Sequence, residues 1–364
     1  MGPSKKLQLD FIYGMRALSA LYIVGHHCFV VAGFFPRGFS FMEHGHDIVA
    51  VFIAISGFCL ALPLAQGGDW NLQAERFYRK RMRRILPPYF ATVAIALVVA
   101  LACSHRSYFQ DYGGTPITWL TVVSHIFLFQ NWIPSELYTL DGPLWSIAVE
   151  CQLYLFFPLL VLLWRKSGTW VTLAVSFIVA HAIFDVTHGL GNSNFLFLFT
   201  EGMLGAKLAF SDRSTRSTRW LGPATLLSFL GYLLTVRATK DLFIGLSVGL
   251  LMAYLTQNRA HWGNLVLGWK PLAWVGTFSY SVYLIHSFFQ VLAYRWVVTA
   301  NFRQLPQSPG ATAALLAFVV SPIAVAASYV FHLSFERPFL SQEREKTEER
   351  PAILVQSPVE LIPM

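Results

Sequence analysis

An arginine and two histidines interrupt an apolar run near the start of the sequence. The stretch RALSALYIVGHHCFVVAG begins at Arg16 and contains His26 and His27. Because an α-helix rises about 1.5 Å and turns about 100° per residue, the eleven steps from Arg16 to His27 put both side chains on one face, about 16 Å apart. A neutral imidazole accepts a proton near pH 7. The spacing predicts a helix with a cation at one end and a proton acceptor near its middle, whereas His26 points about 100° away and is expected to serve in packing.

A second group of cations lies in the run RFYRKRMRRILPPY. Arg81 and Arg84 are spaced i, i+3 and therefore share one helix face. Two guanidinium groups on one face suit a phosphate, because each offers a planar fork of N–H donors.

Two carboxylates and a further histidine lie in later apolar runs. Glu150 lies about 9 Å inside the run PLWSIAVECQLYLFFPLL, and Tyr154 follows one turn later on the same face. His286 lies near mid-membrane depth in TFSYSVYLIHSFF, and Glu336 closes the last run in SFERPF. An ionisable group at membrane depth opposes insertion by about 2.5–3.5 kcal/mol, so such groups usually mark a functional site.

Each of these residues also has a purely structural alternative. Arginines at the ends of spans anchor helices at the lipid interface, and basic runs bind lipid headgroups. Histidines inside a bundle form helix–helix hydrogen bonds, and carboxylates form ion pairs with neighbouring helices. The sequence HGHD, from His44 to Asp47, also suggests a metal site, but no cluster of further ligands completes one. We therefore expect no metal, and expect this segment to form an outer loop or the edge of an acceptor site.

The composition indicates the fold class that positions these groups. Only 13% of the 364 residues are charged and 55% are hydrophobic, whereas soluble proteins carry about 25% charged residues. Apolar runs approach the roughly 20 residues that cross a bilayer as a helix, without the alternation of a membrane β-barrel. The sequence predicts an all-α, polytopic integral membrane protein with about ten transmembrane helices, the first of them retained. The expected spans are 11–34, 46–66, 86–104, 143–164, 170–187, 195–210, 220–236, 241–257, 272–294 and 312–335.

The distribution of charge predicts the orientation. Basic residues concentrate in alternate segments, beginning with Lys5, Lys6 and the run 76–84, which places both termini in the cytoplasm. This asymmetry accounts for most of the net charge of +8 without a nucleic-acid partner. We expect one transmembrane domain over residues 1–340 and a polar, disordered cytoplasmic tail over 341–364. Residues 117–132 are expected to form a short interfacial or re-entrant segment.

The predicted depths separate the candidate residues into two layers. Four lie at the cytoplasmic face: Arg16, Arg81, Arg84 and Glu336. Three lie at or above mid-depth: His27, Glu150 and His286. An anionic donor with a long arm would fit this arrangement, because its head would bind below and its reactive end would reach a histidine above.

In order along the chain, these segments resemble the motifs of the membrane-bound acyltransferase-3 family. RALSALYIVGHH resembles the family's first motif, and Arg16 and His27 match its arginine and histidine. RMRRILPPY resembles the family's Arg-x-x-Arg run, which Arg81 and Arg84 match. FIAISGF resembles the second-helix motif. PLWSIAVECQLYLFFP resembles the Trp-Ser-x-x-Val-Glu stretch, and SYSVYLIH and FERPF resemble the late motifs; the residues matched are Trp145, Ser146, Glu150, His286 and Glu336. The family usually has a proline after the late histidine, where this chain has Ser287.

The resemblance implies transfer of an acyl group, most often acetyl, from acyl-CoA to a hydroxyl of a sugar in a surface polysaccharide, an exopolysaccharide or its lipid-linked precursor. It implies no bound cofactor and a bacterial cytoplasmic membrane location. His27 is then the candidate base or acyl acceptor, and Glu150 or His286 orients it. The arginines bind the donor's phosphates, Glu336 holds the arginines in place, and Tyr154, Trp145 and Ser146 support the site.

Three other functions remain open from the sequence. The first is acylation of a small molecule such as a macrolide. The second is a glycolipid transporter or flippase without acyltransferase activity, although we find no internal repeat of the kind many transporters show. The third is a structural scaffold, which would not need ionisable groups at mid-depth.

Overall fold

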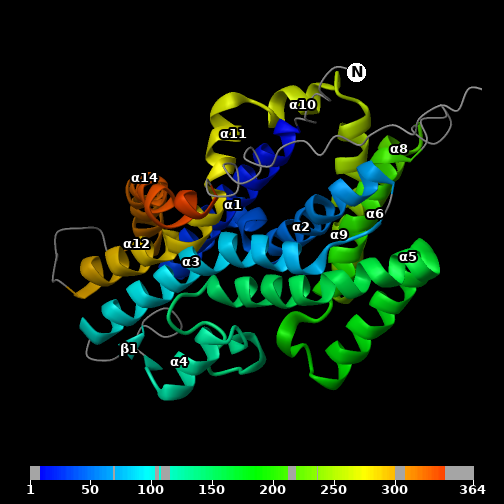
Figure 1. Ribbon diagram of the computed structural model, residues 1–364. Helices are drawn as coiled ribbons and strands as arrows, with labels where there is room; N and C mark the ends of the chain where they lie inside the picture. Colours follow the sequence, from blue (N-terminus) through cyan, green and yellow to red (C-terminus); the bar gives the residue numbers. More distant parts are fainter. Residues whose placement is uncertain are drawn as a thin grey trace, which may run out of the picture.

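The computed structural model is a bundle of helices (Figure 1). It describes residues 9–68, 70–102, 106–107, 115–211, 219–235, 237–299 and 308–340. The predicted tail over 341–364 lies outside the described residues. The α-helices are α1 Asp10–Ala32, α2 Gly45–Gly67, α3 Ala74–Ala102, α4 Trp119–Ile126, α5 Leu144–Val186, α6 Phe195–Phe210, α8 Leu221–Leu234, α9 Arg237–Gln257, α10 Trp262–Leu267, α11 Lys270–Thr277, α12 Ser279–Thr299, α13 Pro309–Leu315 and α14 Ser321–Phe331.

Shorter elements connect these helices. Three 3-10 helices, η1 to η3, span Arg37–Glu43, Gln130–Trp132 and Leu190–Asn192, and two π-helical segments, η4 and η5, span Leu316–Val320 and His332–Glu336. Two-residue strands β1 (Arg106–Ser107) and β2 (Thr115–Pro116) pair antiparallel, with Arg106 opposite Pro116. In the expected interfacial segment 117–132, α4 has eight residues and is too short to cross a bilayer.

Each of the ten predicted spans overlaps a helix of the structure. Within the described residues, five helical stretches are long and apolar enough to cross a membrane: Asp10–Ala32, Arg37–Gly67, Ala74–Ala102, Leu144–Val186 and Pro309–Leu340. These stretches support the prediction of an all-helical integral membrane protein. The total of ten crossings and the cytoplasmic position of the termini stay predictions.

The third helix begins twelve residues earlier than the predicted span. α3 starts at Ala74 rather than at residue 86, and it continues through Pro87 and Pro88. A proline lacks the N–H that bonds to the carbonyl four residues earlier, yet the helix continues through both prolines. The run that holds Arg81 and Arg84 is therefore part of the same helix, which carries both side chains to the arginine-lined cavity described below.

Two predicted spans form one continuous element that changes direction at a glycine. α5 contains a single residue with non-helical backbone angles, Gly168, at φ 82° and ψ 175°. A side chain disfavours positive φ, so glycine is the residue that permits this turn. The two arms of α5 diverge from this point (Figure 1), and they correspond to the predicted spans 143–164 and 170–187.

Close contacts between backbones hold one side of the bundle together. α6 packs against α2 and α9, and α8 packs against α9 (Figure 1). A Cβ atom added at Gly202 on α6 would lie 2.1 Å from the carbonyl oxygen of Ala54 on α2, and one added at Gly57 on α2 would lie 2.0 Å from that of Phe199. Small residues allow this approach, and the packing then supplies much of the attraction between helices in a membrane. The position of α2, which lines both cavities described below, depends on these two glycines.

We predict that Gly202→Ala destabilises the fold by about 1–3 kcal/mol, because the added methyl forces α2 and α6 apart. Thermal unfolding of the purified protein in detergent measures the effect. Gly67→Ala is the matched control, because no atom lies within 4 Å of its added Cβ. An equal decrease in both variants would show that the α2–α6 contact is not the cause.

Candidate active site

Two adjoining cavities lie among α1, α2, α3, α5 and α12. The first, of about 90 Å³, we call the arginine cavity; its polar lining includes Arg16, Ser56, Arg81, Arg84, Glu150 and Tyr154. The second, of about 440 Å³, we call the histidine cavity; its lining includes His26, His27, Glu43, His46, Tyr138 and Trp145. Val49 and Tyr283 line both cavities, so the two meet at these side chains.

The first helix, α1, contributes one side chain to each cavity, as the eleven-residue spacing of Arg16 and His27 predicts. Arg16 lines the arginine cavity and His27 lines the histidine cavity, and both lie on the uninterrupted helix α1. His26 also lines the histidine cavity, and its Nδ1 lies 2.6 Å from the carbonyl oxygen of Met42. The two histidines therefore reach one cavity, although His26 is also fixed to the segment that follows α1.

His27 and His286 form a directly bonded pair. The distance between His27 Nδ1 and His286 Nε2 is 2.7 Å, and His286 is fully buried. His286 Nδ1 lies 2.9 Å from the carbonyl oxygen of Val282 and 3.0 Å from that of Tyr283. Carbonyl oxygens only accept hydrogen bonds, so His286 Nδ1 carries the hydrogen and its Nε2 accepts one from His27 Nδ1. This assignment leaves Nε2 of His27 with a free lone pair beside the histidine cavity.

Glu150 does not lie with His27 and His286, as its predicted depth had placed it. Its Oε1 accepts a hydrogen bond from Ser56 Oγ at 2.5 Å and another from the Tyr154 hydroxyl, within the arginine cavity. The predicted depth assumed that the membrane boundary lies where the apolar run begins. Trp145, near the start of α5, already lines the histidine cavity, so Glu150 lies more than one turn further, at the level of the arginines. Of the two residues expected to orient His27, the one in contact with it is His286.

The three arginines converge without a salt bridge to any described carboxylate. Arg16 interacts electrostatically with Arg84, Glu336 and Glu150. The guanidinium carbon of Arg81 lies 5.9 Å from the ring centre of Tyr154, and its Nε is buried without a hydrogen-bond partner among the described residues. Three guanidinium groups near two carboxylates leave one excess positive charge, which is costly in a buried site unless an anion compensates it. The arrangement therefore favours an anionic ligand.

Glu336 lies near this cluster but bonds elsewhere. Its Oε2 accepts hydrogen bonds from Ser281 Oγ at 2.7 Å and from His332 Nδ1 at 2.8 Å, and the side chain is buried. It interacts electrostatically with Arg16 and Arg84. Glu336 therefore interacts with the arginines through its charge and not through hydrogen bonds. Its hydrogen bonds join α12 to the final helical segment, η5.

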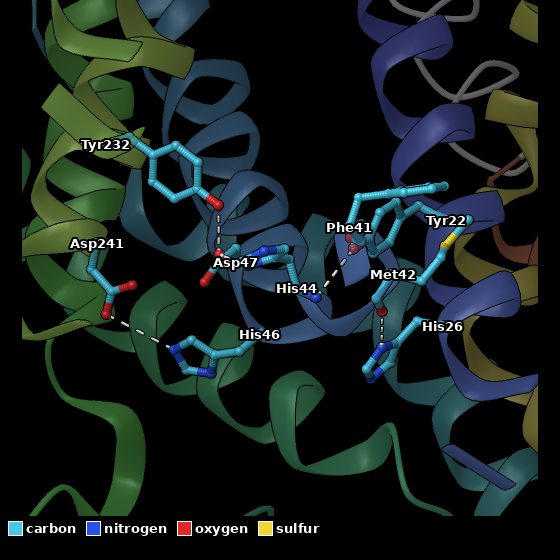
Figure 2. A network of polar contacts seen from close by, with 9 residues as sticks. All are labelled: Tyr22, His26, Phe41, Met42, His44, His46, Asp47, Tyr232 and Asp241. Carbon is cyan, nitrogen blue, oxygen red and sulfur yellow. Dashed lines mark hydrogen bonds and ion pairs between the residues drawn. The ribbon is translucent and has the colours of Figure 1, made fainter. Parts of the chain in front are cut away.

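The HGHD segment forms a polar network at the rim of the histidine cavity (Figure 2). Asp47 Oδ2 lies 2.8 Å from His44 Nδ1 and accepts a hydrogen bond from the Tyr232 hydroxyl at 2.7 Å. His46 points away from His44, and its Nε2 lies 3.9 Å from Asp241 Oδ2 (Figure 2). The His46 ring stacks on Trp145, with ring centres 6.1 Å apart and planes 7° apart. In the part of the chain that the structure describes, no group of three or more metal-binding side chains occurs.

Two residues of the site, Tyr283 and Ser56, were not expected from the sequence, whereas Ser146 was expected to support it. Ser146 Oγ lies 2.7 Å from the hydroxyl of Tyr283, which forms part of the junction between the cavities. Tyr283 precedes His286 by three residues and so shares its helix face. This spacing could have indicated Tyr283 as a residue of the site. Ser56 lies in the FIAISGF segment, but nothing in that segment specifies a carboxylate partner 94 positions away.

A family model described as an acyltransferase domain matches residues 9–333. The chain belongs to this acyltransferase family. The predicted resemblance is thereby confirmed over nearly the whole chain, and with the apolar helices it identifies an integral membrane protein. No solved structure matches the chain.

Among the curated relatives of this chain, two carry peptidoglycan O-acetyltransferase names. It is 24% identical to the peptidoglycan O-acetyltransferase OatA of Listeria monocytogenes over 76% of this chain and 48% of that protein. It is 26% identical to the putative peptidoglycan O-acetyltransferase YrhL of Bacillus subtilis, over 75% of this chain and 47% of that protein. The chain thus spans about half the length of these two relatives. It is also 24% identical to the acyltransferase MdmB of Streptomyces mycarofaciens over 92% of each chain.

A buried carboxyl group in the loop before α5 contacts the residue that follows His286 of the histidine pair. Asp141 is fully buried, and its Oδ1 accepts a hydrogen bond from Ser287, the residue after His286. Removal from water raises the pKa of the Asp141 carboxyl well above its usual range, because burial disfavours the charged form. The folded protein therefore holds this proton more tightly than the unfolded chain does.

We predict that Asp141 makes the fold less stable as pH rises. The contribution of Asp141 to folding stability is greatest when the pH is below the pKa of the unfolded chain, about 3.9. It decreases as the pH rises from there toward the raised pKa of the folded protein. Asp141→Asn is neutral throughout and keeps an acceptor for Ser287, so its melting temperature should exceed that of the wild type by a margin that grows with pH. Thermal unfolding in detergent across this range measures the margin, with the exposed Asp185→Asn as control. Parallel wild-type and Asp141→Asn curves would contradict this role.

Proposed function

We propose that this protein is an acyl-CoA-dependent O-acyltransferase of a bacterial cytoplasmic membrane. The acyl group is acetyl, and the acceptor is a hydroxyl of a sugar in a surface polysaccharide or exopolysaccharide, or in its lipid-linked precursor. The observation that carries the proposal is the His27–His286 pair, which presents a free imidazole nitrogen to one cavity directly next to a cavity of unpaired arginines.

In the proposed reaction, His27 is the general base. Its Nε2 takes the proton of the acceptor hydroxyl as the oxygen attacks the thioester carbonyl carbon. The new C–O bond forms, the C–S bond breaks, and His27 returns the proton to the departing thiolate, which leaves as coenzyme A thiol. Because Nδ1 of His27 donates to His286, the transient imidazolium is stabilised by the same hydrogen bond that fixes its tautomer.

The donor's phosphates would occupy the arginine cavity. Arg16, Arg81 and Arg84 supply the positive charge, and Glu150 is already held by two hydroxyl donors, Ser56 and Tyr154, so it does not neutralise the guanidinium groups by direct pairing. Guanidinium groups recognise phosphate oxygens through paired N–H donors. The acyl end of the donor would then point through the junction at Val49 and Tyr283 toward His27.

The histidine cavity suits an acceptor that carries hydroxyl groups. Aromatic rings of Trp145, Tyr138 and Tyr283 line it together with polar side chains of His46 and Glu43. Pockets of this kind combine apolar surface with a few polar groups that fix the ligand's orientation. The names of two relatives, peptidoglycan O-acetyltransferases, support a carbohydrate acceptor. A small-molecule acceptor such as a macrolide would use the same chemistry and is separated from a polysaccharide by assaying both.

We predict that His27→Ala lowers the rate of acetyl transfer by about 10²–10⁴-fold, the usual contribution of a general base. The O-acetyl content of cell-surface and secreted polysaccharide, measured at equal protein levels, reports the change. His181→Ala is the matched control, because that histidine lies on the second arm of α5 and, among the described residues, forms its hydrogen bond within its own helix, to Phe177. Unchanged acetylation in a folded His27→Ala protein would refute the proposal, and glycolipid movement without acyl transfer would favour a flippase.

We predict that Arg84→Ala raises the KM for acyl-CoA about tenfold or more, because a charge-assisted hydrogen bond to phosphate is lost. Steady-state kinetics with varied donor and varied acceptor separate the two substrates. The neighbouring Arg83, which does not line the arginine cavity, provides the control variant Arg83→Ala. A change in acceptor affinity alone would mean that the arginine cavity does not bind the donor.

A further inference from the structure

We propose that an uncharged sugar ring of the acceptor stacks on the paired rings of His46 and Trp145 in the histidine cavity. We call these two rings the aromatic platform. His46 lies in the first turn of α2, and Trp145 lies in the first turn of α5. This inference rests on the proposed function and names the part of the site that binds its acceptor.

The two rings of the aromatic platform form an offset parallel pair. Their planes lie 7° apart and their centres 6.1 Å apart. At this separation parallel rings overlap only in part, so the pair presents a wider surface than either ring alone. Both residues line the histidine cavity, and 47% of the His46 side chain is exposed. The surface is therefore open to a ligand in that cavity.

Neighbouring helices fix the aromatic platform in place. The fully buried Phe195 on α6 packs against both rings, with its centre 5.2 Å from that of His46 and 6.2 Å from that of Trp145. A Cβ added at Gly45, the residue before His46, would overlap the imidazole of His26, so α2 begins in close contact with α1. The surface is thus formed before a ligand arrives, and binding does not have to order it.

A flat aromatic surface with polar groups at its edge suits a sugar ring. The face of an aromatic ring carries negative partial charge and attracts the C–H groups on one face of a pyranose, whose apolar surface is also removed from water. The sugar hydroxyls project from the ring's edge and need polar partners. Glu43 lines the same cavity, and Asp241 Oδ2 lies 3.9 Å from Nε2 of His46. Both carboxylates can accept hydrogen bonds from hydroxyls.

The charges around the histidine cavity oppose an anionic ligand. Among the described side chains that line it, none is a lysine or an arginine, whereas three arginines line the neighbouring cavity. Lys240, next to Asp241, packs over the Tyr232 ring at 5.1 Å and does not line the cavity. A phosphorylated or carboxylated ring would meet Glu43 without a compensating cation. The adenine of coenzyme A, which brings phosphates with it, is disfavoured for the same reason.

The test uses the purified full-length protein, acetyl-CoA as donor, and neutral methyl glycosides as acceptors: the glucoside, galactoside, mannoside and N-acetylglucosaminide. A methyl aglycone is chosen because an aromatic one would itself stack on the platform. Methyl glucuronide is the anionic comparison, because it differs from the glucoside only by a carboxylate in place of the hydroxymethyl group. Steady-state kinetics with varied donor and varied acceptor give a separate KM for each substrate.

Trp145→Ala should raise the acceptor KM about tenfold or more, and His46→Ala about three- to tenfold, because stacking surface is lost. The KM for acetyl-CoA should change less than about twofold. His46→Phe and Trp145→Phe keep a ring and should restore most of the acceptor affinity. Methyl glucuronide should have a KM about tenfold or more above that of the glucoside.

The matched controls are His181→Ala and Trp170→Ala. Both residues lie on the second arm of α5 and line neither cavity, so neither KM should change. An unchanged acceptor KM in both His46→Ala and Trp145→Ala would overturn the proposal. So would an increase in the KM for acetyl-CoA alone, which would place the adenine of the donor on the aromatic platform.

Equilibrium binding of the same glycosides, measured by calorimetry, separates this proposal from the proposed function. Saturable binding that Trp145→Ala abolishes would support the aromatic platform even if no glycoside is acetylated, and the failure would then lie with the proposed function. Absence of saturable binding for every neutral glycoside would overturn the aromatic platform.

Discussion

The structure depends on one constraint: an ionisable group cannot face lipid without a large loss of free energy. Arg16, Glu150 and His27 lie on helices that are apolar on most of their surface, so these groups must point inward, toward one another or toward a cavity. The helices α1, α2, α3, α5 and α12 meet that constraint together by enclosing two adjoining polar spaces. The same arrangement that shields these side chains from lipid also concentrates unpaired positive charge next to a proton acceptor.

Residues whose positions follow from helical geometry could be predicted from the sequence. The eleven-residue step from Arg16 to His27 correctly placed the two side chains at different levels of one helix, and the i, i+3 spacing placed Arg81 and Arg84 together. Predictions that required knowledge of neighbouring helices succeeded less well. Glu150 lies with the arginines rather than with the histidines, because its depth depends on how far α5 extends past the junction and not on where its apolar run begins.

Other features could not be predicted because they are contacts between distant segments. The tautomer of His27 is set by His286, which is set in turn by backbone carbonyls one helical turn away. Asp141 lies in a loop of ordinary composition, and only burial against Ser287 gives its carboxyl unusual properties. The start of α3 at Ala74, twelve residues before the predicted span, also could not be predicted from the apolar run alone.

The junction of the two cavities also bears on the electrical integrity of the membrane. Two adjoining polar cavities inside a membrane protein would short-circuit an ion gradient if a continuous column of water joined them to each other and to both membrane surfaces. Val49 and the Tyr283 ring present apolar surface where the two cavities meet, and apolar surface at such a boundary opposes a continuous column of water. An apolar boundary of this kind would let the two cavities hold different ligands while the membrane around them stays insulating.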